Sequence, residues 1–137
     1  MSLLALSMAL LTAGEAAAQP DPTIFGNWRN PRATVQVAIR PCGASACGMV
    51  VWATPKAQAD ARRGSGRDLI GQELFQDFTQ QRDKTWNGKV YVPDLNLTFA
   101  GSAQALDPTR LRARGCVLRR ILCKVQVWSR VPSSDPQ

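Results

Sequence analysis

The sequence predicts an all-β fold, an antiparallel up-and-down β-barrel of about eight strands. Short segments rich in alternating or β-branched residues recur along the 137 residues, and Gly, Pro, Asn or Asp separates them. The strand–helix alternation that a parallel sheet needs does not occur. Eight consecutive antiparallel strands would leave two exposed edges, and closure into a barrel removes both. A two-sheet sandwich with a similar number of strands is the alternative.

The clearest strand is the second, in which Val35, Val37 and Ile39 alternate along one face. The polar, Ala/Arg-rich segment 56–68 is expected to be mainly a mobile connection, with at most a turn of helix. The polar residues 132–137 are expected to be a disordered tail. The expected strands are Ile24–Asn30, Thr34–Arg40, Gly48–Thr54, Ile70–Thr79, Thr85–Val92, Leu95–Ala103, Arg110–Val117 and Ile121–Val131.

Residues 3–13 form an apolar run that is too short to cross a bilayer. A small-x-small site ends at Ala18, so we expect a signal peptide over 1–18, a single domain over 19–131 and a periplasmic or secreted product. No Lys or Arg precedes the run, which leaves room for a start further upstream. The alternative is a buried N-terminal helix.

Four cysteines form two closely spaced pairs, and each pair runs into a segment that carries a tryptophan. In an oxidising compartment this pattern predicts disulfides, and a hairpin already holds its two arms within disulfide reach. We therefore expect Cys42–Cys47 and Cys116–Cys123 to pair. The alternative is a four-thiolate zinc site, which the spacings do not favour.

The chain has no histidine, so Ser-His-Asp and Cys-His catalysis and imidazole metal sites are excluded. Its carboxylates are scattered, and no spacing suggests an acid–base pair. We expect no catalytic residue, no metal and no cofactor, and a protein that is not an enzyme.

Basic residues outnumber acidic ones by 17 to 10, which gives a net charge of +7. Arg110, Arg112 and Arg114 alternate, so a strand would place all three on one face. Such a face could bind phospholipid heads or other anions. Its commoner role is the solvated outside of a sheet. Nucleic acid is not an expected partner, because no recognised binding motif is present.

Five motifs together resemble the bacterial family called domain of unknown function 2147, over about 24–131. The resemblance implies small exported proteins with a lipocalin-like barrel and no established activity. The usual Gly-Lys-Thr-Tyr turn is replaced here by Asp94–Thr98. The matching motifs are Gly26-Asn27-Trp28, Pro41-Cys42-Gly43 with Cys47-Gly48 and Val51-Trp52, Leu69-Ile70-Gly71, Trp86–Tyr91, and Arg114-Gly115-Cys116 with Leu122-Cys123-Lys124 and Trp128-Ser129-Arg130.

Gly26-x-Trp28, with Arg130 in the closing strand, is similar to the lipocalin arrangement, in which the Trp plugs one end of the barrel and the Arg stacks over it. This resemblance implies that the first and last strands pair. Arg130 would then act as a structural lock. A basic residue near the C-terminus would otherwise be assigned to the surface.

Two functions follow, and they differ in whether the barrel is hollow. The first is a periplasmic binding module for a small apolar or amphipathic molecule such as a fatty acid. The second is a cell-envelope interaction protein with a filled barrel, whose arginine face docks on anionic lipid, polymer or an acidic protein. If the protein is a binding module, the residues expected to line its ligand cavity are Trp52, Trp86, Tyr91 and Trp128.

Overall fold

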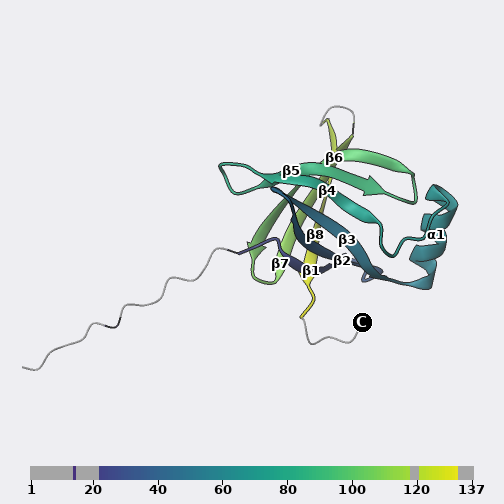
Figure 1. The fold of residues 1–137 in the computed structure, drawn as a ribbon, viewed down its shortest axis with the longest axis horizontal. Coiled ribbons are helices and arrows are strands. Elements are labelled where there is room, and N and C mark those ends of the chain that lie inside the picture. Colours follow the sequence, from purple (N-terminus) through teal and green to yellow (C-terminus); the bar gives the residue numbers. More distant parts are fainter. Residues whose placement is uncertain (1–13, 15–21, 118–120, 133–137) are drawn as a thin grey trace, which may run out of the picture.

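The computed structural model describes residues 14, 22–117 and 121–132 (Figure 1). The expected signal peptide, apart from Gly14, and nearly all of the expected tail lie outside these residues. The described chain is mostly strand, as predicted. Its elements are β1 (Gly26–Arg29), β2 (Val35–Cys42), β3 (Ser45–Ala53), α1 (Pro55–Ser65), β4 (Glu73–Gln80), β5 (Trp86–Val92), β6 (Leu97–Asp107), β7 (Arg110–Val117) and β8 (Leu122–Arg130).

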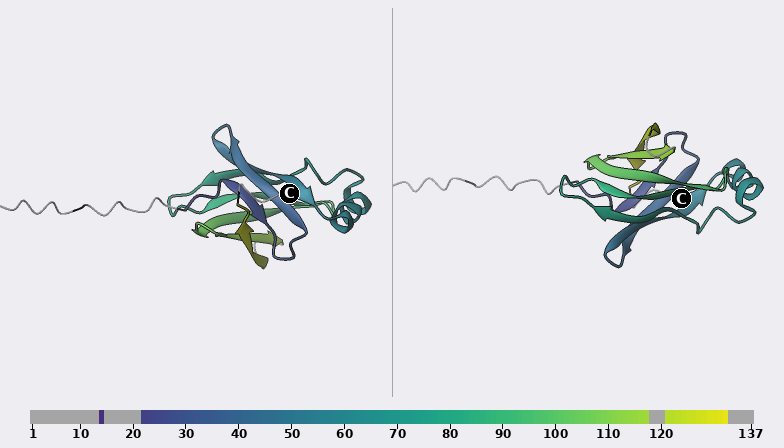
Figure 2. Two further views of the ribbon diagram at one scale, coloured as in Figure 1. Left: turned by 90° about the horizontal axis from the view of Figure 1, so that it is seen from below. Right: turned by 90° about the horizontal axis from the view of Figure 1, so that it is seen from above.

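The strands form one closed barrel in sequence order, which confirms the predicted up-and-down topology over the sandwich. Every neighbouring pair is antiparallel. β8 closes the barrel on β1, with Trp28 opposite Arg130 and Arg29 opposite Ser129. Figure 2 shows the strands wrapping around a common axis, with α1 at one end.

The expectation of a mobile connection over 56–68 is wrong, because α1 is an eleven-residue helix. The Thr54 side chain accepts a hydrogen bond from Ala57 N at 3.2 Å, and proline occupies the first helical position. Gly66 ends the helix in the left-handed region at φ 72°, with its N–H on Arg62 O. The sequence contains these cap residues, but the polar composition of the segment led us to expect a connection rather than a helix. No helix of the described residues is long and apolar enough to span a membrane.

The strand ends also differ from the predicted ones, most clearly at β4. This strand begins at Glu73 rather than Ile70, because the chain first turns at Gly71 with φ 93°. At the first disulfide, β2 and β3 reach further than predicted, and both Cys42 and Cys47 lie within strands. β1 starts two residues later than expected, at Gly26, and β6 continues to Asp107.

A bulge in β4 shapes the core. Strict alternation would put Phe75 and Phe78 on opposite faces. Instead, the register to β5 shifts between Gln76 and Thr79, and Asp77 adopts φ 52°. Both phenylalanines are therefore buried, and their rings meet edge to face at 5.6 Å.

Candidate functional site

Trp28 lies in β1 and has no exposed surface. Its indole Nε1 donates to Ile24 O at 2.7 Å, so the only polar atom of the ring is satisfied. The Arg130 guanidinium carbon lies 4.2 Å from the indole centroid, within the range of a cation–π contact. The Arg130 side chain of the last strand thus stacks on the Trp28 ring of the first strand.

Arg130 also ties three segments together through carbonyl oxygens. It donates to Pro108 O at 2.5 Å, Phe25 O at 2.7 Å and Thr23 O at 2.8 Å. A Cβ at Gly26 would lie 2.3 Å from Arg130 Nη1, so only glycine leaves room for the guanidinium there. Burial lowers the pKa of Arg130 from its usual value. One charged side chain at the end of β8 thus contacts the segment before β1 and the β6–β7 turn.

Two of the four aromatic residues predicted to line a ligand site, Trp128 and Trp86, pack against other aromatic rings. Trp128 is buried in the core, and its ring lies 5.5 Å from Phe75. Its Nε1 donates to Gln126 Oε1 at 3.1 Å. Trp86 is half-buried and meets the edge of Phe25 at 5.7 Å. Both rings are taken up by contacts within the barrel.

The other two predicted residues, Tyr91 and Trp52, take no part in these ring contacts. Tyr91 is buried near the end of β5, where its hydroxyl donates to Asn96 Oδ1 at 2.7 Å and the Arg67 guanidinium lies 5.8 Å from its ring. Trp52 is half-buried and pairs across β2–β3 with Gln36, outside the core cluster. The structure gives no ring contact between any two of the four predicted residues. The ring contacts therefore do not join these four residues into one cluster.

Several large side chains are buried in the core of the barrel. The phenylalanine pair and Trp128 form a chain of edge-to-face contacts. The largest fully buried side chains are Trp28, Phe78, Leu111, Val37 and Val50.

The predicted arginine row lies on the outside of β7. Arg110, Arg112 and Arg114 are exposed, whereas Leu111 and Ala113 between them are buried. One face of the strand therefore packs the core while the other presents three guanidinium groups to solvent. We call these three residues the arginine row.

The arginine row is not uniform along its length. Arg110 is held by Asp107, with Nε 2.7 Å from Oδ2. The pKa of Asp107 is lowered to about 2, and the hydrogen bond from Arg110 is the largest cause. No hydrogen bond or ion pair joins Arg112 to another described residue, so its charge faces solvent.

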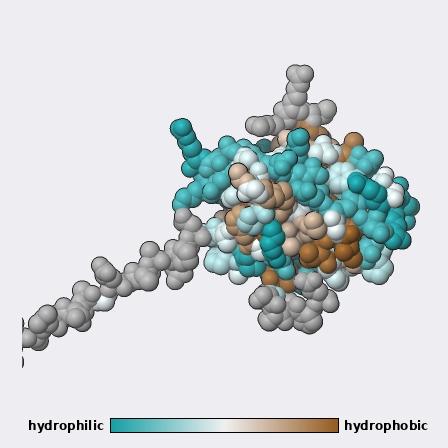
Figure 3. Space-filling model, viewed as in Figure 1, coloured by the Kyte–Doolittle hydropathy of each residue, from teal (hydrophilic) through white to brown (hydrophobic). Residues whose placement is uncertain are grey.

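Exposed apolar residues flank the arginine row, which sequence reasoning missed. Across β7–β8, Arg112 pairs with Val127 and Arg114 with Val125, and these valines are 42% and 46% exposed. Toward the hairpin tip, Ile121 is 83% exposed and Leu122 is 62% exposed. In Figure 3, brown atoms lie at the base of the grey tip at the top of the view. We call these four residues the apolar flank.

A signal for the apolar flank was present in the sequence. Trp128 is buried, so the residues two and four positions before it, Gln126 and Lys124, share its face. Val125 and Val127 must then point outward, which inverts the usual pattern of a strand with polar residues outside.

A small cleft of about 140 Å³ lies on the outside of β5, β6 and β7. The backbone of Gly88 and Gly101, which pair directly across β5–β6, forms its floor, and a Cβ at either position would point to the other face of the sheet, toward Phe78 or Val90. Polar groups around the floor come from Asn87 and Ser102, which pair directly, and from Arg114, which pairs with Ser102. Ala100 and Cys116 complete the lining. None of the four predicted ligand residues lines this cleft.

Both predicted disulfides are formed, which removes the thiolates that the zinc alternative needs. Cys116 and Cys123 are directly opposite in the β7–β8 register, with Cα atoms 4.0 Å apart. The Cys42 and Cys47 Cα atoms are 5.9 Å apart, and their positions are offset in the β2–β3 register.

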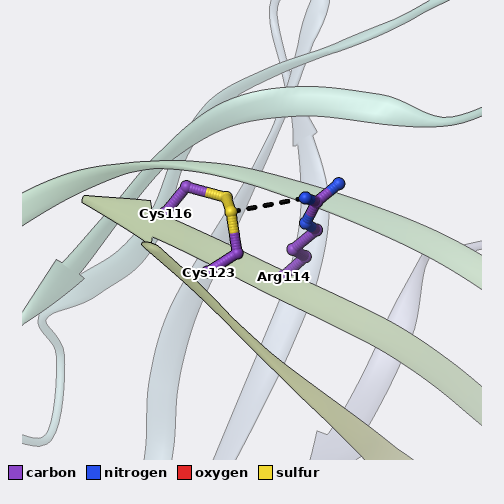
Figure 4. Close-up of a disulfide and its surroundings, with 3 residues drawn as sticks. All are labelled: Arg114, Cys116 and Cys123. Carbon is purple, nitrogen blue, oxygen red and sulfur yellow. Dashed lines mark hydrogen bonds between the residues drawn. A yellow bond between two sulfur atoms is a disulfide. The ribbon is translucent and has the colours of Figure 1, made fainter. Parts of the chain in front are cut away.

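An arginine stands two residues before the first cysteine of each pair, but the two arginines have different partners. Arg114 Nη2 lies 3.3 Å from Cys123 Sγ (Figure 4). Arg40 instead donates to Asn27 Oδ1 at 3.0 Å and to Ile39 O at 3.1 Å. The sequence shows both arginines, but only the fold determines which of them reaches a disulfide.

Comparison with known proteins gives one match. A family of bacterial proteins, described as uncharacterized protein conserved in bacteria (DUF2147), matches residues 26–130. This range runs from the first residue of β1 to the last residue of β8 and so covers the whole barrel. No curated protein and no solved structure matches the chain.

Proposed function

The chain belongs to the DUF2147 family of uncharacterized bacterial proteins, and from the geometry of its barrel we propose that it is a non-enzymatic interaction module that docks on anionic lipid. The docking surface combines the arginine row with the apolar flank. One observation carries the proposal, namely that exposed valines lie directly opposite Arg112 and Arg114 across β7–β8. Basic and exposed apolar groups side by side are the combination that suits a charged lipid interface.

The magnitudes indicate why both kinds of residue are needed. Each Lys or Arg close to an anionic bilayer contributes about 1 kcal/mol. The arginine row therefore contributes roughly 3 kcal/mol at most, less than the ~4 kcal/mol of millimolar binding. Arg110 contributes less than its neighbours, because Asp107 already neutralises it. Burial of Ile121 and Leu122 in the interface supplies the additional free energy.

The other predicted function, binding of a small apolar ligand, has less support from the geometry. It needs Trp52, Trp86, Tyr91 and Trp128 to surround one cavity. Two of the four belong to the buried core, and Trp52 lies outside the core cluster. The contacts that Trp86 and Trp128 make with neighbouring rings support a scaffold rather than a carrier.

We further propose that the protein acts after export, in the periplasm or outside the cell. Two disulfides support this location, since disulfides persist in oxidising compartments. N-terminal sequencing of protein recovered from the periplasm tests it. The proposal predicts a mature chain that begins at or near Gln19, and recovery of chain that still carries Met1 would contradict it.

Vesicle co-sedimentation tests the docking surface. We expect wild-type protein to bind vesicles that contain phosphatidylglycerol and not vesicles of phosphatidylcholine alone, and to be released as salt rises. Arg112→Glu should weaken binding by about tenfold, because it replaces attraction with repulsion. Arg82→Glu in the β4–β5 turn makes the same charge change elsewhere and should weaken binding less than threefold.

Two results would overturn the docking proposal. One is equal weakening by Arg112→Glu and Arg82→Glu, which would mean that only net charge matters. The other is binding to an anionic polymer in the absence of binding to the vesicles, which would assign the surface to a different partner.

A further inference from the structure

We propose that Cys116–Cys123 is a site of thiol–disulfide exchange that accepts small anionic thiols, whereas Cys42–Cys47 is not. This inference is independent of lipid docking. Its first support is the position of Arg114, whose Nη2 lies 3.3 Å from Cys123 Sγ (Figure 4). When a disulfide opens, one sulfur leaves as a thiolate, and a neighbouring positive charge stabilises that thiolate. Arg114 thus favours Cys123 as the leaving sulfur.

The cleft supplies the second support, because it is lined by Cys116 and not by Cys123. An attacking thiol can therefore reach Cys116 from the cleft while Cys123 departs beside Arg114. A cavity of about 150 Å³ admits benzene, so a cleft of about 140 Å³ has room for a molecule with a few carbon atoms. Arg114, Asn87 and Ser102 give the cleft donors for a carboxylate. A short mercapto acid fits both the size and the charge.

The exchange balances without any further oxidant. The thiolate of the incoming thiol attacks Cys116 Sγ, the Cys116–Cys123 bond breaks, and its electron pair leaves on Cys123 Sγ. A mixed disulfide between the small thiol and Cys116 results. A second thiolate then attacks the sulfur of the small thiol and releases Cys116. Two thiols become one small disulfide, and their two protons end on Cys116 and Cys123.

The other hairpin provides the matched comparison within one molecule. All four cysteines are half-buried, so neither disulfide is fully exposed or fully enclosed. Arg40 has the same sequence position relative to its disulfide as Arg114, but it donates to Asn27 and Ile39. No lining residue of the cleft comes from β2 or β3. The Cys42–Cys47 pair therefore lacks both features.

The test treats the full-length oxidised protein with limiting 3-mercaptopropionate or neutral 2-mercaptoethanol at equal thiolate concentrations. Samples are alkylated at intervals, and peptide mass spectrometry identifies each opened disulfide. We expect Cys116–Cys123 to open about tenfold faster than Cys42–Cys47, with the mixed disulfide on Cys116. Arg114→Gln should slow the Cys116–Cys123 reaction by roughly three- to tenfold and abolish the preference for the anionic thiol. Arg40→Gln should change neither rate.

The wild-type protein alone also tests the proposal, because salt should reduce the preference for 3-mercaptopropionate by screening Arg114. Circular dichroism shows whether Arg114→Gln keeps the fold, and Arg114→Lys, which retains the charge, should keep part of the preference. Equal opening rates for the two disulfides would overturn the proposal. So would a mixed disulfide on Cys123, or a preference that salt does not change.

Discussion

The β2–β3 and β7–β8 hairpins have the same sequence plan but different surroundings. Each carries an arginine two residues before a cysteine, a short disulfide loop and a returning strand with a tryptophan. In β7–β8 the tryptophan is buried in the core, and the outer face carries the arginine row and the apolar flank. In β2–β3 the tryptophan lies outside the core cluster, and the arginine is bound to Asn27. The same sequence motif therefore has different contacts in the two hairpins, which depend on its neighbours in the barrel.

The largest difference between the hairpins should be the effect of removing each tryptophan on stability. Trp128→Ala removes a 7%-exposed ring that packs on Phe75 and should lower the free energy of unfolding by about 3–5 kcal/mol. Trp52→Ala removes a half-buried ring and should cost less than about 2 kcal/mol. Urea denaturation measures both. A larger loss for Trp52→Ala would reverse the assignment of core and surface.

The two disulfides, in contrast, should stabilise the fold almost equally. Their sequence separations are 5 and 7, so the chain-entropy estimate gives about 2–2.5 kcal/mol for each. Replacing both cysteines of one pair with serine, and then those of the other, should give losses within about 0.5 kcal/mol of each other. A much larger loss from one pair would show that the disulfides already differ in their structural role, before any difference in reactivity.

At the last residue of β8, the contact between Arg130 and Trp28 should have an intermediate effect on the free energy of unfolding. Arg130→Ala should lower the free energy of unfolding by about 1–2 kcal/mol, because it removes the cation–π contact and the hydrogen bonds to three carbonyls. Arg40→Ala in the other hairpin should cost under about 0.5 kcal/mol. In a double-mutant cycle, Arg130→Ala with Trp28→Leu should cost less than the sum. Strict additivity would remove the lock from this account.

The smallest effect concerns the base of the arginine row. The pKa of Asp107 is lowered to about 2, so its carboxylate is protonated, and releases Arg110, at a lower pH than is usual for aspartate. Because the folded-state pKa is depressed, the stability that this pair contributes is complete above pH 3.8 and is lost as the pH falls through about 2. An NMR titration of the Asp107 carboxyl should give the low value, and Arg110→Gln should raise it toward 3.8. An unchanged value in Arg110→Gln would contradict the assigned cause.

Much of the fold could be predicted from the sequence because local patterns determine it. Alternation in Thr34–Arg40 marks a strand, hairpin spacing predicts both disulfides, and the positions of Trp28 and Arg130 correspond to the first and last strands. The helix α1 was missed because it buries only Ala61, so its sequence carries almost no apolar stripe. Its caps were the better signal.

The site was less predictable because it depends on contacts across strands. Periodicity placed the arginine row on one face, and the register to β8 then determined that Val125 and Val127 flank it. The contact from Arg114 to Cys123 depends on a side-chain direction that Arg40, in an equivalent position, does not share. A one-residue shift of register would reverse every outward and inward assignment on β8.

The central claim is that β7–β8 is the hairpin that meets an anionic lipid surface, while β2–β3 is structural. NMR of isotope-labelled protein with phosphatidylglycerol nanodiscs tests it most directly, because backbone amides held at the lipid surface broaden. We expect little change over 40–47 and the strongest broadening at the docking residues Arg112, Arg114, Ile121, Leu122, Val125 and Val127. Broadening that is strongest in β2–β3, or that spreads evenly over all basic surfaces of the barrel, would contradict it.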